Sequence, residues 1–96
     1  MKIRNFLHQG LQRLYLDGNA KGVPSDTVDK LRKMFAFLEV MSHADEVRAL
    51  TSWKAHTLTG DQKGMVSLSV TRNRRLTFRV GAAEQETYDV NLEDCH

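Results

Sequence analysis

The sequence contains a single cysteine, a single proline and no long uninterrupted run of apolar residues. One cysteine excludes an internal disulfide and indicates folding in a reducing compartment, so we expect a cytoplasmic protein. Without a long apolar run, the sequence predicts neither a signal peptide nor a membrane span. The 96 residues are 41% hydrophobic and 27% charged, which argues against disorder and predicts one domain over residues 1–96.

Positive charge is concentrated in one part of the chain, although the net charge is only +2. Residues 48–79 hold seven basic residues and one acid, whereas residues 81–96 hold five acids and no lysine or arginine. A basic patch of this kind favours a phosphate-bearing partner such as a nucleic acid. The alternative is a solvated face with interleaved charges.

The first half of the chain carries apolar residues at helical spacing, after a short strand predicted over residues 2–6. Leucines recur at three- and four-residue steps within residues 7–16, which predicts a helix that Gly18 would end. Pro24 then opens a longer amphipathic helix that continues to Met41. A break and a single helical turn follow it.

The second half alternates apolar and polar residues, which is typical of antiparallel strands with one covered and one open face. The predicted strands comprise residues 53–58 and three runs marked by Val66, Leu68 and Val70, by Leu76, Phe78 and Val80, and by Tyr88, Val90 and Leu92. Arg75, Thr77 and Arg79 alternate with the second run, so they would line the open face. We therefore predict an α+β fold: a short N-terminal strand, two helices, then an antiparallel β-meander with the helices packed on one sheet face.

Four residues in the second half suit the cleavage of RNA. Cleavage needs groups that take and give a proton, and a cation that stabilises the phosphorane. His56 and His96 can exchange protons near neutral pH, and Arg75 can bind two phosphate oxygens. Asp94 lies two residues before His96, so on a regular strand it would share its face and could orient the imidazole. If the sheet brings these side chains together, they form a candidate catalytic site.

Further basic residues are expected to position the backbone of RNA: Lys54, Lys63, Arg72, Arg74 and Arg79. Structural interpretations compete with the functional ones, because His56 could simply end a strand, Arg75 could be solvated and the chain end could be frayed. His8 and His43 are expected to be surface or helix-cap residues. No short spacing of histidine and cysteine predicts a metal site.

These residues resemble the HigB-type toxins of the RelE/ParE superfamily, also described as plasmid maintenance system killer proteins. The resemblance rests on a histidine before a Gly-Asp turn, on two strands around Asn73, and on an acidic end closed by a histidine. The matching stretches are residues 53–56, 58–61, 67–70, 75–78 and 93–96. The resemblance covers essentially the whole chain and is strongest in its second half.

The resemblance implies a RelE-like fold and the toxin of a type II toxin–antitoxin system. Such a toxin is a metal-independent endoribonuclease without a cofactor, which cleaves translated mRNA in the ribosomal A site through 2′-hydroxyl attack and inhibits translation. The resemblance also implies that His56 and the terminal motif form the active site. The implied partner is a HigA-type helix-turn-helix antitoxin, in a heterotetramer that binds operator DNA through the antitoxin.

The chain departs from the family's pattern at several positions of the expected site. Thr57 replaces a common proline, Thr59 replaces a lysine that could contact phosphate, and Cys95 replaces a tyrosine. Val66 and Arg74 stand where aromatic residues are usual. A second interpretation is therefore a catalytically weakened toxin that still binds antitoxin and ribosome. A third is a non-enzymatic basic RNA-binding module.

Overall fold

A computed structural model describes residues 1–57, 64–81 and 83–94. Its elements, in chain order, are β1 (Lys2–Ile3), α1 (Gln9–Asp17), the 3-10 helix η1 (Ser25–Thr27), α2 (Val28–Val40), α3 (Ala44–Arg48), β2 (His56–Thr57), β3 (Val66–Thr71), β4 (Arg74–Gly81) and β5 (Glu86–Asp94). The predicted α+β fold is confirmed. No helix in the described residues has both the length and the apolar character needed to cross a bilayer.

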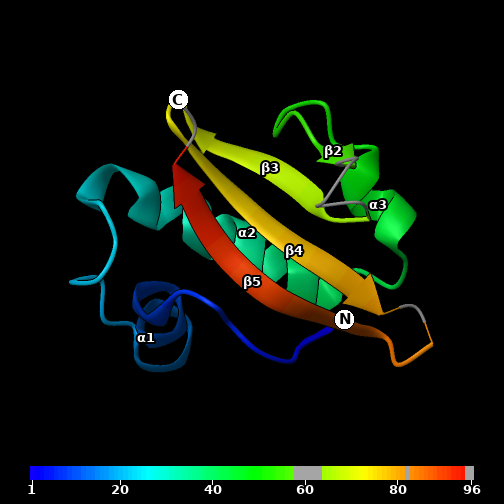
Figure 1. Ribbon diagram of the computed structural model, residues 1–96, viewed down its shortest axis with the longest axis horizontal. Helices are drawn as coiled ribbons and strands as arrows, with labels where there is room; N and C mark the ends of the chain where they lie inside the picture. The colour runs from blue at the N-terminus through cyan, green and yellow to red at the C-terminus, as the bar shows by residue number, and fades with distance from the viewer. Residues whose placement is uncertain (58–63, 82, 95–96) are drawn as a thin grey trace.

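The strands of the described residues form one sheet in the order β1-β5-β4-β3-β2. All neighbouring pairs are antiparallel except β1 and β5, which run parallel. The N-terminal segment continues beside β5 past the end of β1, because the Arg4 N–H donates to the Thr87 carbonyl at 2.7 Å and the Leu7 N–H to the Val90 carbonyl at 2.8 Å. The chain start therefore closes the edge of β5, as Figure 1 shows.

Helix α1 begins at Gln9, two residues later than the leucine spacing predicts. His8 is its N-cap, and the imidazole Nδ1 accepts a hydrogen bond from the Leu11 N–H at 3.1 Å. Gly18 ends the helix in the left-handed conformation, with φ of 69°, which glycine adopts without steric cost. His43 is the N-cap of α3, so both histidines have the capping positions expected of them.

Helix α2 supplies most of the helical side of the core. Its buried residues Leu31, Met34, Phe35 and Leu38 belong to the same cluster as the inward side chains of β3, β4 and β5. Figure 1 shows α2 lying across one face of β4 and β5. Burying a side chain of this size contributes about 1.5–3 kcal/mol, so packing on α2 fixes which face of the sheet is covered. The opposite face is left for polar side chains.

One predicted strand orientation is wrong. Alternation placed Tyr88 inside with Val90 and Leu92, but the register of β4 and β5 shifts at a bulge. Thr87 lies opposite Val80 and is fully buried, whereas Tyr88 lies opposite Arg79 on the outer face.

The bulge depends on Asp89, whose φ of 54° lies in the left-handed region. Asn5 stabilises this conformation from the neighbouring segment. Its side-chain amide donates to Asp89 Oδ1 at 3.0 Å, and its Oδ1 accepts from the Asp89 N–H at 3.0 Å. The extra residue changes which side chains face outward over the first part of β5.

Candidate active site

The pairing of β2 with β3 and of β3 with β4 places His56 and Arg75 on the same face of the sheet. His56 lies opposite Ser67, which lies opposite Thr77, and Ser69 lies opposite Arg75 in the next row. Residues opposite each other on paired strands share a face. This is the face that the alternation predicts for Arg75, away from α2.

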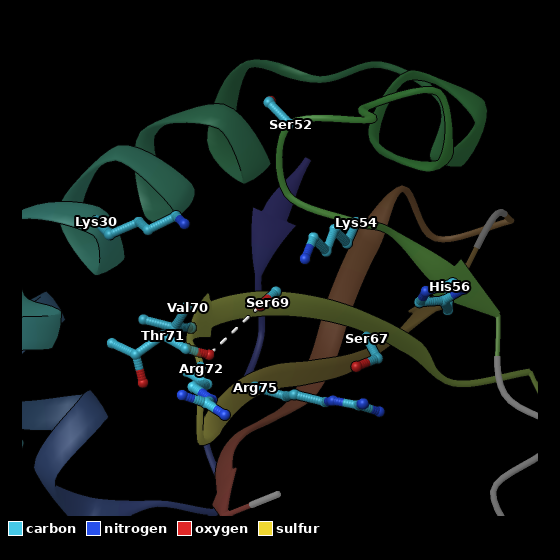
Figure 2. Close-up of a pocket in the computed structure, with 10 residues that line it drawn as sticks. All are labelled: Lys30, Ser52, Lys54, His56, Ser67, Ser69, Val70, Thr71, Arg72 and Arg75. Carbon is cyan, nitrogen blue, oxygen red and sulfur yellow. Dashed lines mark hydrogen bonds between the residues drawn. The ribbon is translucent and has the colours of Figure 1, made fainter.

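A pocket of about 470 Å³ opens on this face, at the edge of β3 beyond the short strand β2. Its lining residues are Lys30, Ser52, Lys54, His56, Ser67, Ser69, Val70, Thr71, Arg72 and Arg75 (Figure 2). The lining brings together α2, the turn before β2, the strands β2, β3 and β4, and the turn that joins β3 to β4.

Among the residues that the structure describes, the lining contains four permanent cations, namely Lys30, Lys54, Arg72 and Arg75, and no carboxylate. Within the described part of the chain, none of these four side chains forms an ion pair. Like charges gathered without a counter-charge repel one another, so the pocket is suited to an anionic ligand. His56 adds a group that can take or give a proton beside these cations.

The turn before β2 differs from the strand predicted over residues 53–58. Residues 51–54 form a turn, β2 starts at His56, and residue 58 lies outside the described residues. Trp53 fixes the turn through its ring, which packs edge-on against Phe37 at 5.6 Å between centroids. Its carbonyl accepts from the Ser69 N–H at 2.8 Å.

Lys54 completes this turn with φ of 49°, a left-handed conformation that is uncommon for a residue with a side chain. Such conformations cluster at functional sites because the surrounding structure must hold them in place. Here the turn places Lys54 in the pocket lining between Ser52 and His56.

The sheet face that carries the pocket is less exposed to solvent than the alternation predicts, because Ser67 and Thr77 are only 1% and 2% exposed. The Thr77 hydroxyl donates to Glu93 Oε2 at 2.6 Å, so a carboxylate from β5 covers it. Glu93 also lies opposite Arg75 in the register of β4 and β5. A negative group therefore borders the cationic pocket without belonging to its lining.

The sequence predicts one site with Asp94, His56 and Arg75, but the structure places Asp94 on the other face of the sheet. It lies opposite Arg74, one residue from the Glu93–Arg75 row, on the side of the sheet where Leu76 and Leu92 point. Its carboxylate accepts a hydrogen bond from the Arg74 guanidinium and forms an ion pair with it. The alternation along β5 explains this placement, since Glu93 occupies the pocket face.

The other predicted site residues are distributed as follows. Arg72 and Lys54 line the pocket, and Arg79 shares its sheet face but lies about 13 Å further along β4 than Arg75. Lys63 and His96 lie outside the described residues. Among the described residues, no cluster of three histidine, cysteine or acidic side chains could hold a metal ion.

Sequence reasoning missed Lys30 and the hydroxyl groups of the lining. The spacing of the apolar residues in α2 leaves Lys30 on the polar side of the helix, and this position gives no sign that the edge of β3 lies beside it. The serines Ser67 and Ser69 alternate with buried residues and share the face of Arg75, so their positions carried a usable signal.

Comparison with known proteins agrees with the fold. Residues 4–96 match the family described as RelE-like toxin of type II toxin-antitoxin system HigB. The chain is also 32% identical over 94 residues to the protein named Endoribonuclease HigB of Proteus vulgaris, covering 98% of this chain and 99% of that relative. The chain therefore belongs to the HigB-like family of RelE-like toxins of type II toxin–antitoxin systems.

Proposed function

We propose that the protein is a ribosome-dependent endoribonuclease that cleaves translated mRNA in the ribosomal A site and so inhibits translation in the cytoplasm. The family supports the role of toxin, and the name of the Proteus vulgaris relative supports RNA cleavage. One observation carries the proposal for this chain. Four cations without a described ion-pair partner surround a pocket that His56 also lines.

In the proposed reaction, the RNA supplies its own nucleophile, the 2′-hydroxyl. His56 exchanges a proton with the reacting oxygen atoms, since its side chain lines the pocket in which the phosphate would lie. Arg75 binds the non-bridging oxygens and stabilises the charge that develops on the phosphorane. Attack forms a bond from the 2′-oxygen to phosphorus and breaks the bond to the 5′-oxygen, which takes up a proton as it leaves.

His96 is proposed as the second proton-transfer group, so that one histidine acts as base and the other as acid. Asp94 is proposed to act by position, because its ion pair with Arg74 fixes the end of β5 two residues before His96. The mechanism uses no metal ion and no cofactor, since imidazole and guanidinium groups cover its proton-transfer and charge-stabilising steps.

The remaining basic residues are proposed to bind the backbone of mRNA or ribosomal RNA, and these are Lys54, Lys63, Arg72, Arg74 and Arg79. The proposed protein partner is a HigA-type helix-turn-helix antitoxin, which neutralises the toxin. Their complex is proposed to be a heterotetramer that binds operator DNA through the antitoxin. A gene for a small helix-turn-helix protein beside this one would support that partnership.

The proposal is tested by expressing the protein without antitoxin and by mapping mRNA ends in ribosomes. We expect growth arrest and new 5′ ends at A-site codons, with purified ribosome complexes giving the same cleavage. His56→Gln should lower the rate by about 10²–10⁴, the usual effect of removing a general acid or base, without unfolding the protein. Full cleavage by the folded His56→Gln protein would exclude His56 from the chemistry.

A catalytically weakened toxin is the second candidate function, and it is favoured by Thr59 and Cys95, which replace a lysine and a tyrosine of the family's pattern. Such a protein would bind antitoxin and ribosome without efficient cleavage. Ribosome co-sedimentation together with the cleavage assay separates the two candidates, because only the weakened toxin would bind fully and cleave poorly.

A further inference from the structure

Lys30 is the only pocket residue contributed by α2, and it stands apart from the strand residues on which the proposed chemistry depends. Figure 2 shows its side chain reaching from α2 toward the space above β3, with Arg72 below it and His56 at the far end. The neighbouring basic residues Arg32 and Lys33 are exposed and do not line the pocket. Helix α2 therefore directs one cation to the pocket and leaves two outside it.

The pocket is long in the direction of β3. Ser67, beside His56, and Thr71, beside Arg72, are four residues apart on this strand, which corresponds to about 13 Å. A single phosphate group is much smaller than this separation. The pocket volume of about 470 Å³ also lies in the range of sites for whole small molecules, roughly 300–1,000 Å³, rather than of a site for one ion.

The charge of the pocket also indicates a ligand with more than one phosphate group. A phosphodiester carries one negative charge, whereas Lys30, Lys54, Arg72 and Arg75 carry four positive charges. Glu93 borders this group on the side of Arg75 and offsets part of the charge there, so the excess is greatest at the end with Lys30 and Arg72. A second phosphate at that end would balance cations that the first phosphate, beside His56 and Arg75, leaves without a partner.

We infer that the pocket holds two consecutive phosphate groups of one RNA strand, and that Lys30 is a positioning residue that contacts the phosphate next to the one cleaved. This inference rests on the proposed cleavage of RNA. Lys30 holds the strand in register so that the reacting phosphate lies beside His56. Its ammonium group forms no ion pair with a described residue, so it is available to a ligand.

The experiment compares Lys30→Gln with Lys33→Gln, a matched loss of charge on the same helix outside the pocket. Each purified protein is given ribosome complexes with a defined mRNA in the A site, and single-turnover cleavage is measured. We expect Lys30→Gln to slow cleavage about tenfold, the size of losing one hydrogen bond to a charged group, and Lys33→Gln to leave it unchanged. Equal melting temperatures show that both variants are folded.

A chemical change in the mRNA identifies the group that Lys30 contacts. One methylphosphonate, which has no charge, replaces the phosphate on either the 5′ or the 3′ side of the cleaved bond. At one of the two positions, the methylphosphonate should slow cleavage by the wild-type protein about tenfold. It should not slow cleavage by the Lys30→Gln protein beyond the rate of that variant on unmodified mRNA, because both changes remove the same contact.

The outcomes separate the inference from the function on which it rests. No cleavage by the wild-type protein would contradict the proposed function. Cleavage that is equal in Lys30→Gln and Lys33→Gln would overturn the role of Lys30 alone. Slowing by Lys30→Gln that adds to the methylphosphonate effect at both positions would also overturn it, because Lys30 would then act without contacting a neighbouring phosphate.

Discussion

Arg74 and Arg75 are adjacent in sequence and lie on opposite faces of the sheet, which makes them a matched pair for testing the site. Arg75 lines the pocket and forms no ion pair with a described residue. Arg74 points to the side of Leu76 and is paired with Asp94. Changing each arginine to glutamine removes the same charge from two different environments.

The expected losses follow from those environments. Removing a donor that stabilises charge in the transition state costs about 10²–10³ in rate, so Arg75→Gln should lower cleavage by that factor. It should change the free energy of unfolding by less than about 0.5 kcal/mol, because the side chain is exposed and leaves no described carboxylate unpaired. Arg74 and Asp94 are 35% and 58% exposed, and such a pair contributes about 0.2–1 kcal/mol. Arg74→Gln should therefore lower the free energy of unfolding by no more than that amount. It should lower cleavage by less than about tenfold, the effect of losing one contact to the RNA backbone, because Arg74 lies on the face away from the pocket.

Single-turnover cleavage of mRNA in purified ribosome complexes measures the loss of activity, and chemical denaturation measures the change in the free energy of unfolding. Both variants are compared at equal concentrations of folded protein. Equal losses of cleavage in the two variants, or a larger loss in Arg74→Gln, would refute the assignment of the chemistry to the His56 face. A large loss of stability in Arg75→Gln would show that this arginine is structural.

Four further changes test the fold and the turn before β2. Gly10→Ala should lower the free energy of unfolding by about 1–3 kcal/mol in denaturant titrations, because the new Cβ would lie 2.1 Å from the Gly22 carbonyl oxygen; Gly18→Ala, with open space around it but φ of 69°, should lose only about 1–2 kcal/mol. Lys54→Gly should leave the melting temperature unchanged or higher, because it relieves a left-handed residue, and should weaken cleavage because the pocket loses a cation; a melting temperature that falls would contradict this. Glu46→Gln should destabilise the protein at neutral pH, and the difference from wild type should disappear in acid. Backbone N–H groups hold the pKa of Glu46 below its ordinary value. The contribution of Glu46 to stability is therefore fully present above the ordinary pKa and is lost as pH falls through the lowered pKa. A difference from wild type that persists in acid would show another cause.

Much of the fold could be predicted because burial imposes a period on the sequence. The alternation of Leu76 and Phe78 with Arg75 and Thr77 follows directly from the pleat of a strand, so the face of Arg75 could be predicted without knowing its neighbours. The inversion at Tyr88 could not be predicted in this way. It depends on a left-handed Asp89 and on side-chain hydrogen bonds from Asn5, which is distant in sequence.

The pocket itself depends on where β2 begins, and this is the step that local sequence signals misrepresent. Trp53 favours a strand by propensity, and a strand from residue 53 would pair Lys54 with Ser69 in regular register. Instead the Trp53 ring packs on Phe37 of α2, and its carbonyl takes the Ser69 N–H one residue earlier than that register requires. The chain turns away at this point, β2 is reduced to two residues, and the edge of β3 stays open between the turn and α2. A contact between an aromatic residue and a helix therefore creates the space in which the cations gather, and only the tertiary structure contains that information.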